Sequence, residues 1–351
     1  MVIFGAGASY DSAPSYAPGM AEIAELSKAQ RDARLPLSDE LFDDRYEFAR
    51  VMKRFPECLP LIPLLRHRET DKSVEAVLES LDAQSNTHAQ GQREMVAIRY
   101  YLQHMIWECQ IRWQDDVHHG VTNYRTLLYL IRHYWRPGQP VCFVTFNYDT
   151  MLEEALHAVE IKIRTIDDYV ASNDYNVFKV HGSVNWGRRI ERAPIENLNR
   201  LKPQETIESV IKIAPVIFDQ RLVSNTYQIM GQLSHQQVDN TPLFPALAIP
   251  AEKKVDFILP DYHLKRLKEF IPTLTKVLII GWRATDAPFL KLLKATPPAA
   301  TVHIVSKDQT EGNQIAERMQ HSRINAAGFF TNYSGFSNFL KRSHPEQVLM
   351  G

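Results

Sequence analysis

The chain has 351 residues, of which 44% are apolar and 23% charged, so it can form one large domain or two ordinary ones and is not a disordered protein. A net charge of −1 at pH 7 excludes a protein that binds nucleic acid through its bulk charge, although a local basic patch stays possible. No secretory signal and no run of 18 apolar residues is visible, so we expect a cytoplasmic protein without a membrane span.

The first predicted element is a short apolar strand, residues 2–4, which leads into Gly5-Ala6-Gly7-Ala8-Ser9. A strand, a glycine-spaced turn and a helix in this order are typical of a phosphate-binding turn, because glycine lets a ligand approach the backbone N–H groups closely. Ser9 is placed to cap the turn or to donate its hydroxyl to the ligand. The third glycine of the usual dinucleotide fingerprint is missing, so a plain strand-to-helix turn stays an equal alternative.

A turn-rich stretch, residues 10–19, follows and predicts either a loop that closes over a ligand or a simple surface connection. From Met20 to about Arg136 the apolar residues recur at helical spacing, which predicts a large helical insertion. The positions at this spacing are Val74, Val77, Leu78 and Leu81, then Met95, Ile98, Leu102, Met105, Ile106 and Cys109, then Leu127, Leu128, Leu130 and Ile131. We expect loops at residues 56–63 and 85–91, and a solvated turn at His118–His119.

Two apolar segments after the insertion predict strands of a parallel sheet that is covered on both faces. The first, residues 141–146, ends in Asn147-Tyr148-Asp149-Thr150 and is followed by a helix that Asp149 or Thr150 is placed to cap. The second, residues 176–180, leads into His181. Because ligands bind at the carboxyl ends of the strands in doubly wound sheets, both polar segments are candidate site residues.

The rest of the chain alternates between predicted strands and helices, which indicates an α/β fold. Predicted strands are residues 210–216, 244–249, 255–259, 276–283, 301–308 and 326–331, and predicted helices are residues 264–270, 288–293, 316–320 and 336–342. Residues 187–240 give the weakest pattern.

The polar strand ends, taken together and in this order, resemble the sirtuin fold, and in particular the bacterial sirtuin-like branch found in anti-phage defence. The segments that carry the resemblance are Gly5–Ser9, Phe146–Asp149, His181–Ser183, Ile280–Asp286 and the strand that ends in Ser306. The resemblance implies a Rossmann-like, doubly wound, mostly parallel sheet that binds NAD, formed by residues 1–19 and 137–351. Residues 20–136 would then be a helical insertion after the first strand, placed to act as a lid or to contact partners.

The same resemblance assigns roles to residues. Gly5, Ala6, Gly7, Ala8 and Ser9 would lie against the pyrophosphate, and Asn147 and His181 would act on the nicotinamide ribose as the catalytic pair. The further cofactor-binding positions are Tyr148, Asp149, Gly281, Trp282, Asp286 and Ser306. Of these, Gly281 and Ser306 would line the adenosine half, Tyr148 would stack near the nicotinamide, and Asp149 would orient its loop.

Two departures from the sirtuin deacylases bear on the reaction. The three cysteines, Cys58, Cys109 and Cys142, cannot build the four-cysteine zinc module and indicate reduced, buried thiols. The Pro-Asp-Phe-Arg segment that follows the glycine turn in deacylases is also absent. We therefore expect an NAD+ glycohydrolase that releases nicotinamide and ADP-ribose, with NAD as substrate and neither zinc nor another metal.

The resemblance further implies an effector of anti-phage defence that depletes NAD in abortive infection. Such an effector would be a homo-oligomer, controlled by a partner such as a HerA-type ATPase or an Argonaute-like protein, without direct nucleic-acid binding. A non-catalytic module that binds NAD or ADP-ribose stays an alternative. A deacylase and a nuclease subunit are weaker alternatives, since the zinc cysteines and a carboxylate cluster with metal spacing are both missing.

Overall fold

The structure is a computed structural model of the whole chain, and it describes residues 1–12, 34–67, 72–85, 88–115, 122–233, 236–250, 257–332, 335–342 and 344–350. The predicted features at residues 13–19, His118–His119 and 251–256 lie outside these ranges. The chain forms two compact units. Unit 1 comprises residues 1–35, 110–181 and 254–351, and unit 2 comprises residues 36–109 and 182–253.

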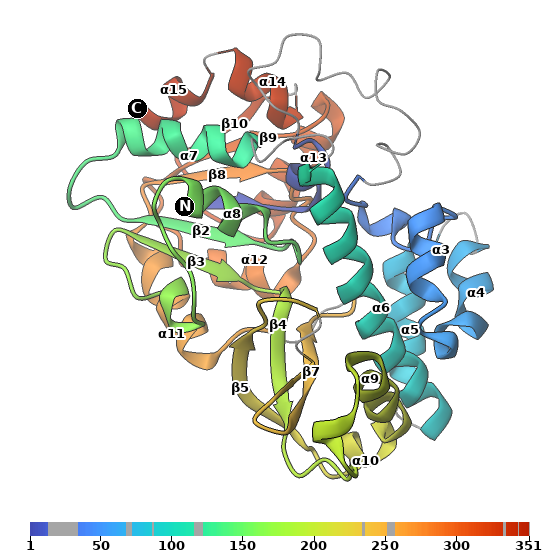
Figure 1. Cartoon of the computed structure of the whole chain (residues 1–351). Coiled ribbons are helices and arrows are strands. Elements are labelled where there is room, and N and C mark those ends of the chain that lie inside the picture. Colours follow the sequence, from blue (N-terminus) through green and yellow to red (C-terminus); the bar gives the residue numbers. More distant parts are fainter. Residues whose placement is uncertain are drawn as a thin grey trace. The chain divides into compact units, whose positions relative to one another are not determined.

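Unit 1 is built on a six-stranded sheet in which every described pair of neighbouring strands is parallel. The strands are β1 (Val2–Phe4), β2 (Val141–Thr145), β3 (Tyr175–Lys179), β8 (Lys276–Ile280), β9 (Thr301–Val305) and β10 (Gly328–Asn332). Their order across the sheet is β3-β2-β1-β8-β9-β10, so the chain progresses outward in opposite directions from the β1–β8 pair (Figure 1). This is the Rossmann order, and the predicted Rossmann-like α/β fold is confirmed.

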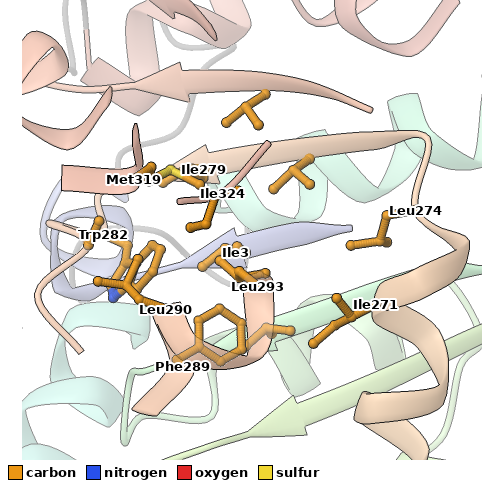
Figure 2. Close-up of a cluster of buried hydrophobic side chains, with 14 of the residues drawn as sticks. Ile3, Ile271, Leu274, Ile279, Trp282, Phe289, Leu290, Leu293, Met319 and Ile324 are labelled. Carbon is orange, nitrogen blue, oxygen red and sulfur yellow. The ribbon is translucent and has the colours of Figure 1, made fainter. Parts of the chain in front are cut away.

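Helices cover both faces of this sheet. Successive side chains of a strand point to opposite faces, and in these buried strands the apolar side chains of both faces pack against helices. Ile3 lies in a hydrophobic cluster with residues of α11 (Asp261–Phe270), α12 (Ala287–Leu293) and α13 (Gln309–His321), part of which Figure 2 shows. The ring of Phe4, the next residue, contacts Tyr124 of α7 (Asn123–Tyr134) and Phe336 of α14 (Gly335–Lys341). The remaining helices of unit 1 are α1 (Ala6–Tyr10), α8 (Met151–Ala158), α15 (His344–Met350) and the short 3-10 turns Asp167–Tyr169 and Ile271–Thr273.

Unit 2 combines helices with a second, antiparallel sheet. Its strands have the order β5-β4-β7-β6 and are β4 (Gly182–Ile190), β5 (Val223–Ile229), β6 (Gln237–Val238) and β7 (Thr241–Leu247). Its helices are α3 (Tyr46–Met52), α4 (Ile62–Arg66), α5 (Val74–Ser85), α9 (Pro203–Lys212) and α10 (Ala214–Asp219), with 3-10 turns at Ser38–Glu40, Pro56–Leu61 and Leu198–Arg200. The long helix α6 (Ala89–Trp113) runs through unit 2 as far as Cys109 and continues into unit 1.

Several predicted elements are wrong. Residues 210–216 are helical, because Ile207, Val210, Ile211, Ala214 and Ile217 recur at helical spacing and all are buried. Residues 257–259, the described part of the predicted strand 255–259, are not a strand, and the segment that begins at Gly182, where no strand was predicted, is the nine-residue strand β4. The loop expected at residues 56–63 is a 3-10 turn that leads into α4.

The compact units also divide the chain differently from the predicted boundaries. Helix α7 belongs to unit 1, although residues 20–136 were expected to form one insertion, and residues 182–253 leave the sheet domain for unit 2. A chain that leaves a domain and returns to it gives no compositional signal at the crossing points. Gly182 marks one such point: its φ is +76°, and a Cβ there would lie 1.9 Å from the carbonyl oxygen of Ala246.

Candidate active site

The site residues predicted from the sequence lie at one edge of the sheet of unit 1. Since the strands are parallel, the ends of β1, β2, β3, β8 and β9 all face the same way, and each is followed by a predicted site residue. In chain order these are Gly5, Asn147, His181, Gly281 and Ser306. Asn147 and His181 each follow by two residues the paired positions Thr145 and Lys179, so they come from neighbouring strands at matching register.

Glycines bring the ends of β1 and β8 together. A Cβ on Gly5 would lie 2.4 Å from the carbonyl oxygen of Gly281, and one on Gly281, whose φ is +63°, would lie 2.4 Å from the amide nitrogen of Ala8. The N–H groups of Gly5 and Gly7 donate to the carbonyl oxygens of Ile280 and Gly281, at 3.0 and 3.1 Å. These glycines are therefore required by backbone packing, in addition to any contact with a pyrophosphate. The Ala6 N–H begins α1, and helix geometry gives it no acceptor within that helix.

The side-chain amide of Asn147 is held in one orientation. Its Nδ2 lies 2.9 Å from the carbonyl oxygen of Gly5, 2.9 Å from Oγ of Ser9 and 3.1 Å from the hydroxyl of Tyr124. Because a carbonyl oxygen only accepts, the atom that faces Gly5 is the amide nitrogen, and Oδ1 points away from these three partners. Asn147 is buried, with 6% of its surface exposed.

Asp149 anchors the same network. The Ser9 hydroxyl donates to its Oδ2 at 2.7 Å, and the Met151 N–H donates to its Oδ1 at 3.1 Å, so Asp149 holds the start of α8 as expected. Burial raises the pKa of Asp149 above its ordinary value, and the nearby Lys179 acts in the opposite direction. Lys179 is fully buried, donates to the backbone oxygen of Asp149 and pairs with Glu153 at 2.9 Å.

His181 forms a pair with Asp286. Its Nε2 lies 2.8 Å from Oδ2 of Asp286, whose Oδ1 accepts from the Phe289 N–H and so caps α12. An ionised carboxylate only accepts, so Nε2 carries the hydrogen and, in the neutral ring, Nδ1 is the basic nitrogen. The imidazole packs edge-on against Phe146, with the ring centroids 5.0 Å apart. Both side chains of the pair are buried and fixed.

The remaining predicted positions have protein contacts of their own. Trp282 stacks on Phe146 and lies in the hydrophobic cluster of Figure 2, where it contacts Phe289. The Ser306 hydroxyl donates to the backbone oxygen of Asp308. The ring of Tyr148 lies 6.3 Å from that of His181. The structure thus brings Asn147, Asp149 and Ser9 into one network, whereas Trp282 packs in the core.

Three residues of this edge were not predicted. Tyr124 reaches the network from α7, and Gln110 of α6 binds both the N–H and the hydroxyl of Thr150. No sequence motif marks either position. Lys179 is different, because a lysine that directly follows the apolar residues Val177 and Phe178 of a predicted buried strand is a signal that could have identified it.

A cavity of about 330 Å³ in unit 1 lies at the other end of β2 and β3, between Ile131, Phe143, Val159 and Tyr175. The cysteines are buried free thiols, and burial raises the pKa of Cys142 to about 12. Within the described ranges no cluster of His, Cys, Asp and Glu has the geometry of a metal site. No helix in the described parts of the chain is both long and apolar enough to cross a bilayer.

Comparison with known proteins bears on residues 141–212, which match the family model described as SIR2-like domain. The matched segment contains β2, α8 and β3, and with them Asn147 and His181. A search of curated proteins finds no match to the chain. SIR2-like domains are typically NAD-dependent enzymes, so the match indicates a function related to NAD. The match thus supports the sirtuin-like resemblance of the sequence motifs over residues 141–212.

Proposed function

We propose that the protein is an NAD+ glycohydrolase that hydrolyses the bond between nicotinamide and ribose at the carboxyl edge of the unit 1 sheet. One observation carries the proposal: Asn147 and the His181–Asp286 pair lie at matching positions of neighbouring strand ends, each held by fixed protein contacts. The SIR2-like match covers Asn147 and His181, and the Rossmann strand order reverses between β1 and β8, where dinucleotides bind in such folds.

The reaction breaks the bond between C1′ of the ribose and the pyridinium nitrogen, and the bonding electron pair leaves with nicotinamide. Water forms the new bond to C1′ and loses a proton, so NAD+ and water give nicotinamide, ADP-ribose and a proton. The leaving group already carries a positive charge, and therefore the protein mainly has to orient the ribose and the water. His181 accepts the proton at Nδ1, while Asp286 holds the opposite nitrogen.

Asn147 has a narrower role in this proposal than the sequence implies. Since Nδ2 is committed to Gly5, Ser9 and Tyr124, the amide offers its Oδ1 to the ligand. A carbonyl oxygen accepts hydrogen bonds, so it suits the ribose hydroxyls or the attacking water. The glycine turn, Tyr148 and Ser306 keep their proposed places along the dinucleotide by resemblance alone.

The test is nicotinamide release from NAD+, measured by chromatography for the wild type, Asn147→Ala and His181→Ala. Loss of the base is expected to lower the rate by about 10²–10⁴-fold. The matched control is His263→Ala, which removes another buried histidine of unit 1, hydrogen-bonded to the backbone oxygen of Ile166. This control should lower stability and keep kcat. A folded His181→Ala protein with full activity contradicts the proposal, and saturable NAD binding without any nicotinamide release favours the binding module.

The proposed cellular role is depletion of NAD in anti-phage defence, under control of oligomerisation or of a partner protein. This part rests on the family resemblance. It predicts that turnover by the purified chain depends on protein concentration or on a partner. Constant specific activity of a monomer across concentrations, at a rate that depletes NAD in cells, contradicts it.

A further inference from the structure

Tyr124 joins the site from a helix that no site motif covers. It lies in the first turn of α7, is 1% exposed, and its ring packs against Phe4 and Phe336. Its hydroxyl lies 2.8 Å from Oγ of Ser9 and 3.1 Å from Nδ2 of Asn147. Burial raises the pKa of Tyr124 well above its ordinary value, so the hydroxyl keeps its hydrogen.

The hydrogen bonds around Tyr124 allow only one direction of donation. Ser9 has one hydroxyl hydrogen and donates it to the carboxylate of Asp149. The contact between Ser9 and Tyr124 is then made by the Tyr124 hydrogen, which leaves the Tyr124 oxygen to accept from Asn147. Donation therefore runs from Tyr124 to Ser9 and from Ser9 to Asp149, while the two hydrogens of the Asn147 amide are shared among the oxygens of Gly5, Ser9 and Tyr124.

We propose that Tyr124 is a positioning residue that acts through Asn147. Because its hydroxyl donates to Ser9, which donates to Asp149, the Tyr124 oxygen is left to accept from the Asn147 amide. This hydrogen bond keeps Nδ2 turned inward and Oδ1 turned toward the ligand. An amide with fewer inward acceptors rotates more freely, and each rotation removes Oδ1 from its place. The choice of the ribose or the water as the group that Oδ1 binds rests on the proposed function. The orientation of the amide is a property of the protein alone.

The experiment compares Tyr124→Phe with Tyr101→Phe. Both substitutions remove a buried hydroxyl, but that of Tyr101 lies in unit 2 and donates to the backbone oxygen of Leu41. The first readout is the side-chain amide resonance of Asn147 in ligand-free protein, assigned with Asn147→Asp. Tyr124→Phe should shift this resonance and speed its hydrogen exchange by about 10-fold, the size expected for one lost hydrogen bond, and Tyr101→Phe should leave it unchanged.

The second readout is nicotinamide release. Tyr124→Phe should lower kcat by about 10-fold and change KM by less than about 3-fold, because a positioning defect acts mainly on the reacting geometry. Unchanged resonance and exchange in Tyr124→Phe, or an unchanged kcat, overturn the inference. If the wild type releases no nicotinamide, the proposed function fails while the resonance still decides the role of Tyr124. Ser9→Ala breaks the same series of hydrogen bonds and replaces Tyr124→Phe if that variant does not fold.

Discussion

Two regions of the molecule bury polar side chains in different ways. At the carboxyl edge of the unit 1 sheet, the buried groups of Ser9, Tyr124 and Asn147 bind one another and end on a carboxylate. Around α6 in unit 2, the buried hydroxyl of Tyr100 and the Nε2 of Gln103 bind backbone oxygens of the antiparallel sheet. Burial alone therefore does not mark a site. The proposed site rests instead on the connection between side chains, because it fixes which atom each group would leave for a ligand.

Two buried histidines show the same contrast. His181 has a carboxylate partner that fixes its tautomer, whereas neither ring nitrogen of His104 has a hydrogen-bond partner among the described residues. Burial lowers the pKa of His104 to about 3, so it stays neutral in a folded protein at physiological pH. His104 packs edge-on against Phe55 and acts as a core residue. The following variants test this contrast, in order of expected effect on stability.

The largest effect is expected where the backbone of Gly5–Ala8, after β1, packs against that of Gly281, after β8. We call this contact the backbone junction. In Gly281→Ala the new Cβ meets the Ala8 nitrogen in a left-handed conformation, which should lower the free energy of unfolding by about 2–5 kcal/mol. Gly138→Ala is the matched control, since its φ is +82° and a Cβ there meets nothing within 4 Å. It should cost only about 1 kcal/mol. Equal losses in chemical denaturation would show that the junction does not need close backbone contact.

The junction and the strand ends also show how far the sequence predicts this site. Apolar runs that end in Asn147, His181 and Gly281 predict parallel strands, and parallel strands bring their polar ends to one edge. The pattern could not predict Tyr124, because its contact with Ser9 spans 115 residues and depends on where α7 packs. The glycines were predicted for a ligand, and the structure adds a packing role that only the paired backbones reveal.

Unit 2 was harder to predict for a different physical reason. Its strand β5 carries no fully buried residue, and so it lacks the continuous apolar run that identifies the strands of unit 1. Strand β4 starts at Gly182, soon after β3 ends at Lys179, and no strand was predicted there. Where a strand has no clear apolar pattern, tertiary contacts decide whether it forms, and the local sequence does not identify it.

The second expected effect concerns the pH dependence of stability through His104. Its folded-state pKa of about 3 lies below the ordinary 6.5, so between these values the unfolded chain binds a proton that the folded protein excludes. The stability that this group provides is present above pH 6.5 and is lost as the pH falls. In the wild type, His104 should lower the free energy of unfolding by up to about 1.4 kcal/mol for each pH unit below 6.5. His104→Leu should lack this decrease, as measured by chemical denaturation at a series of pH values between 4.5 and 7.

His263, whose pKa burial lowers to about 4, stays in that variant, so part of the pH dependence should remain. Nicotinamide release should be unchanged in His104→Leu, because this histidine belongs to the packing region. A variant with the wild-type pH dependence would show that His104 is protonated or solvated in the folded state. If His104→Leu loses nicotinamide release, the buried polar residues of unit 2 also affect the reaction, and the contrast with the carboxyl edge of the unit 1 sheet does not hold.

The smallest effect on stability is expected at Asp286, where one carboxylate serves both packing and the proposed site. In Asp286→Asn the side chain still caps α12, since asparagine caps helices as well as aspartate does, so stability should hold. Because the single amide oxygen stays on the Phe289 N–H, the amide nitrogen faces Nε2 of His181 and moves the hydrogen of the neutral ring to Nδ1, so kcat should fall as in loss of the base, by about 10²–10⁴-fold. Asp308→Asn is the matched control, because Asp308 caps α13 in the same way without contacting His181. If both variants lose the same activity, Asp286 acts only as a helix cap, and the connection between side chains at this edge has no bearing on the reaction.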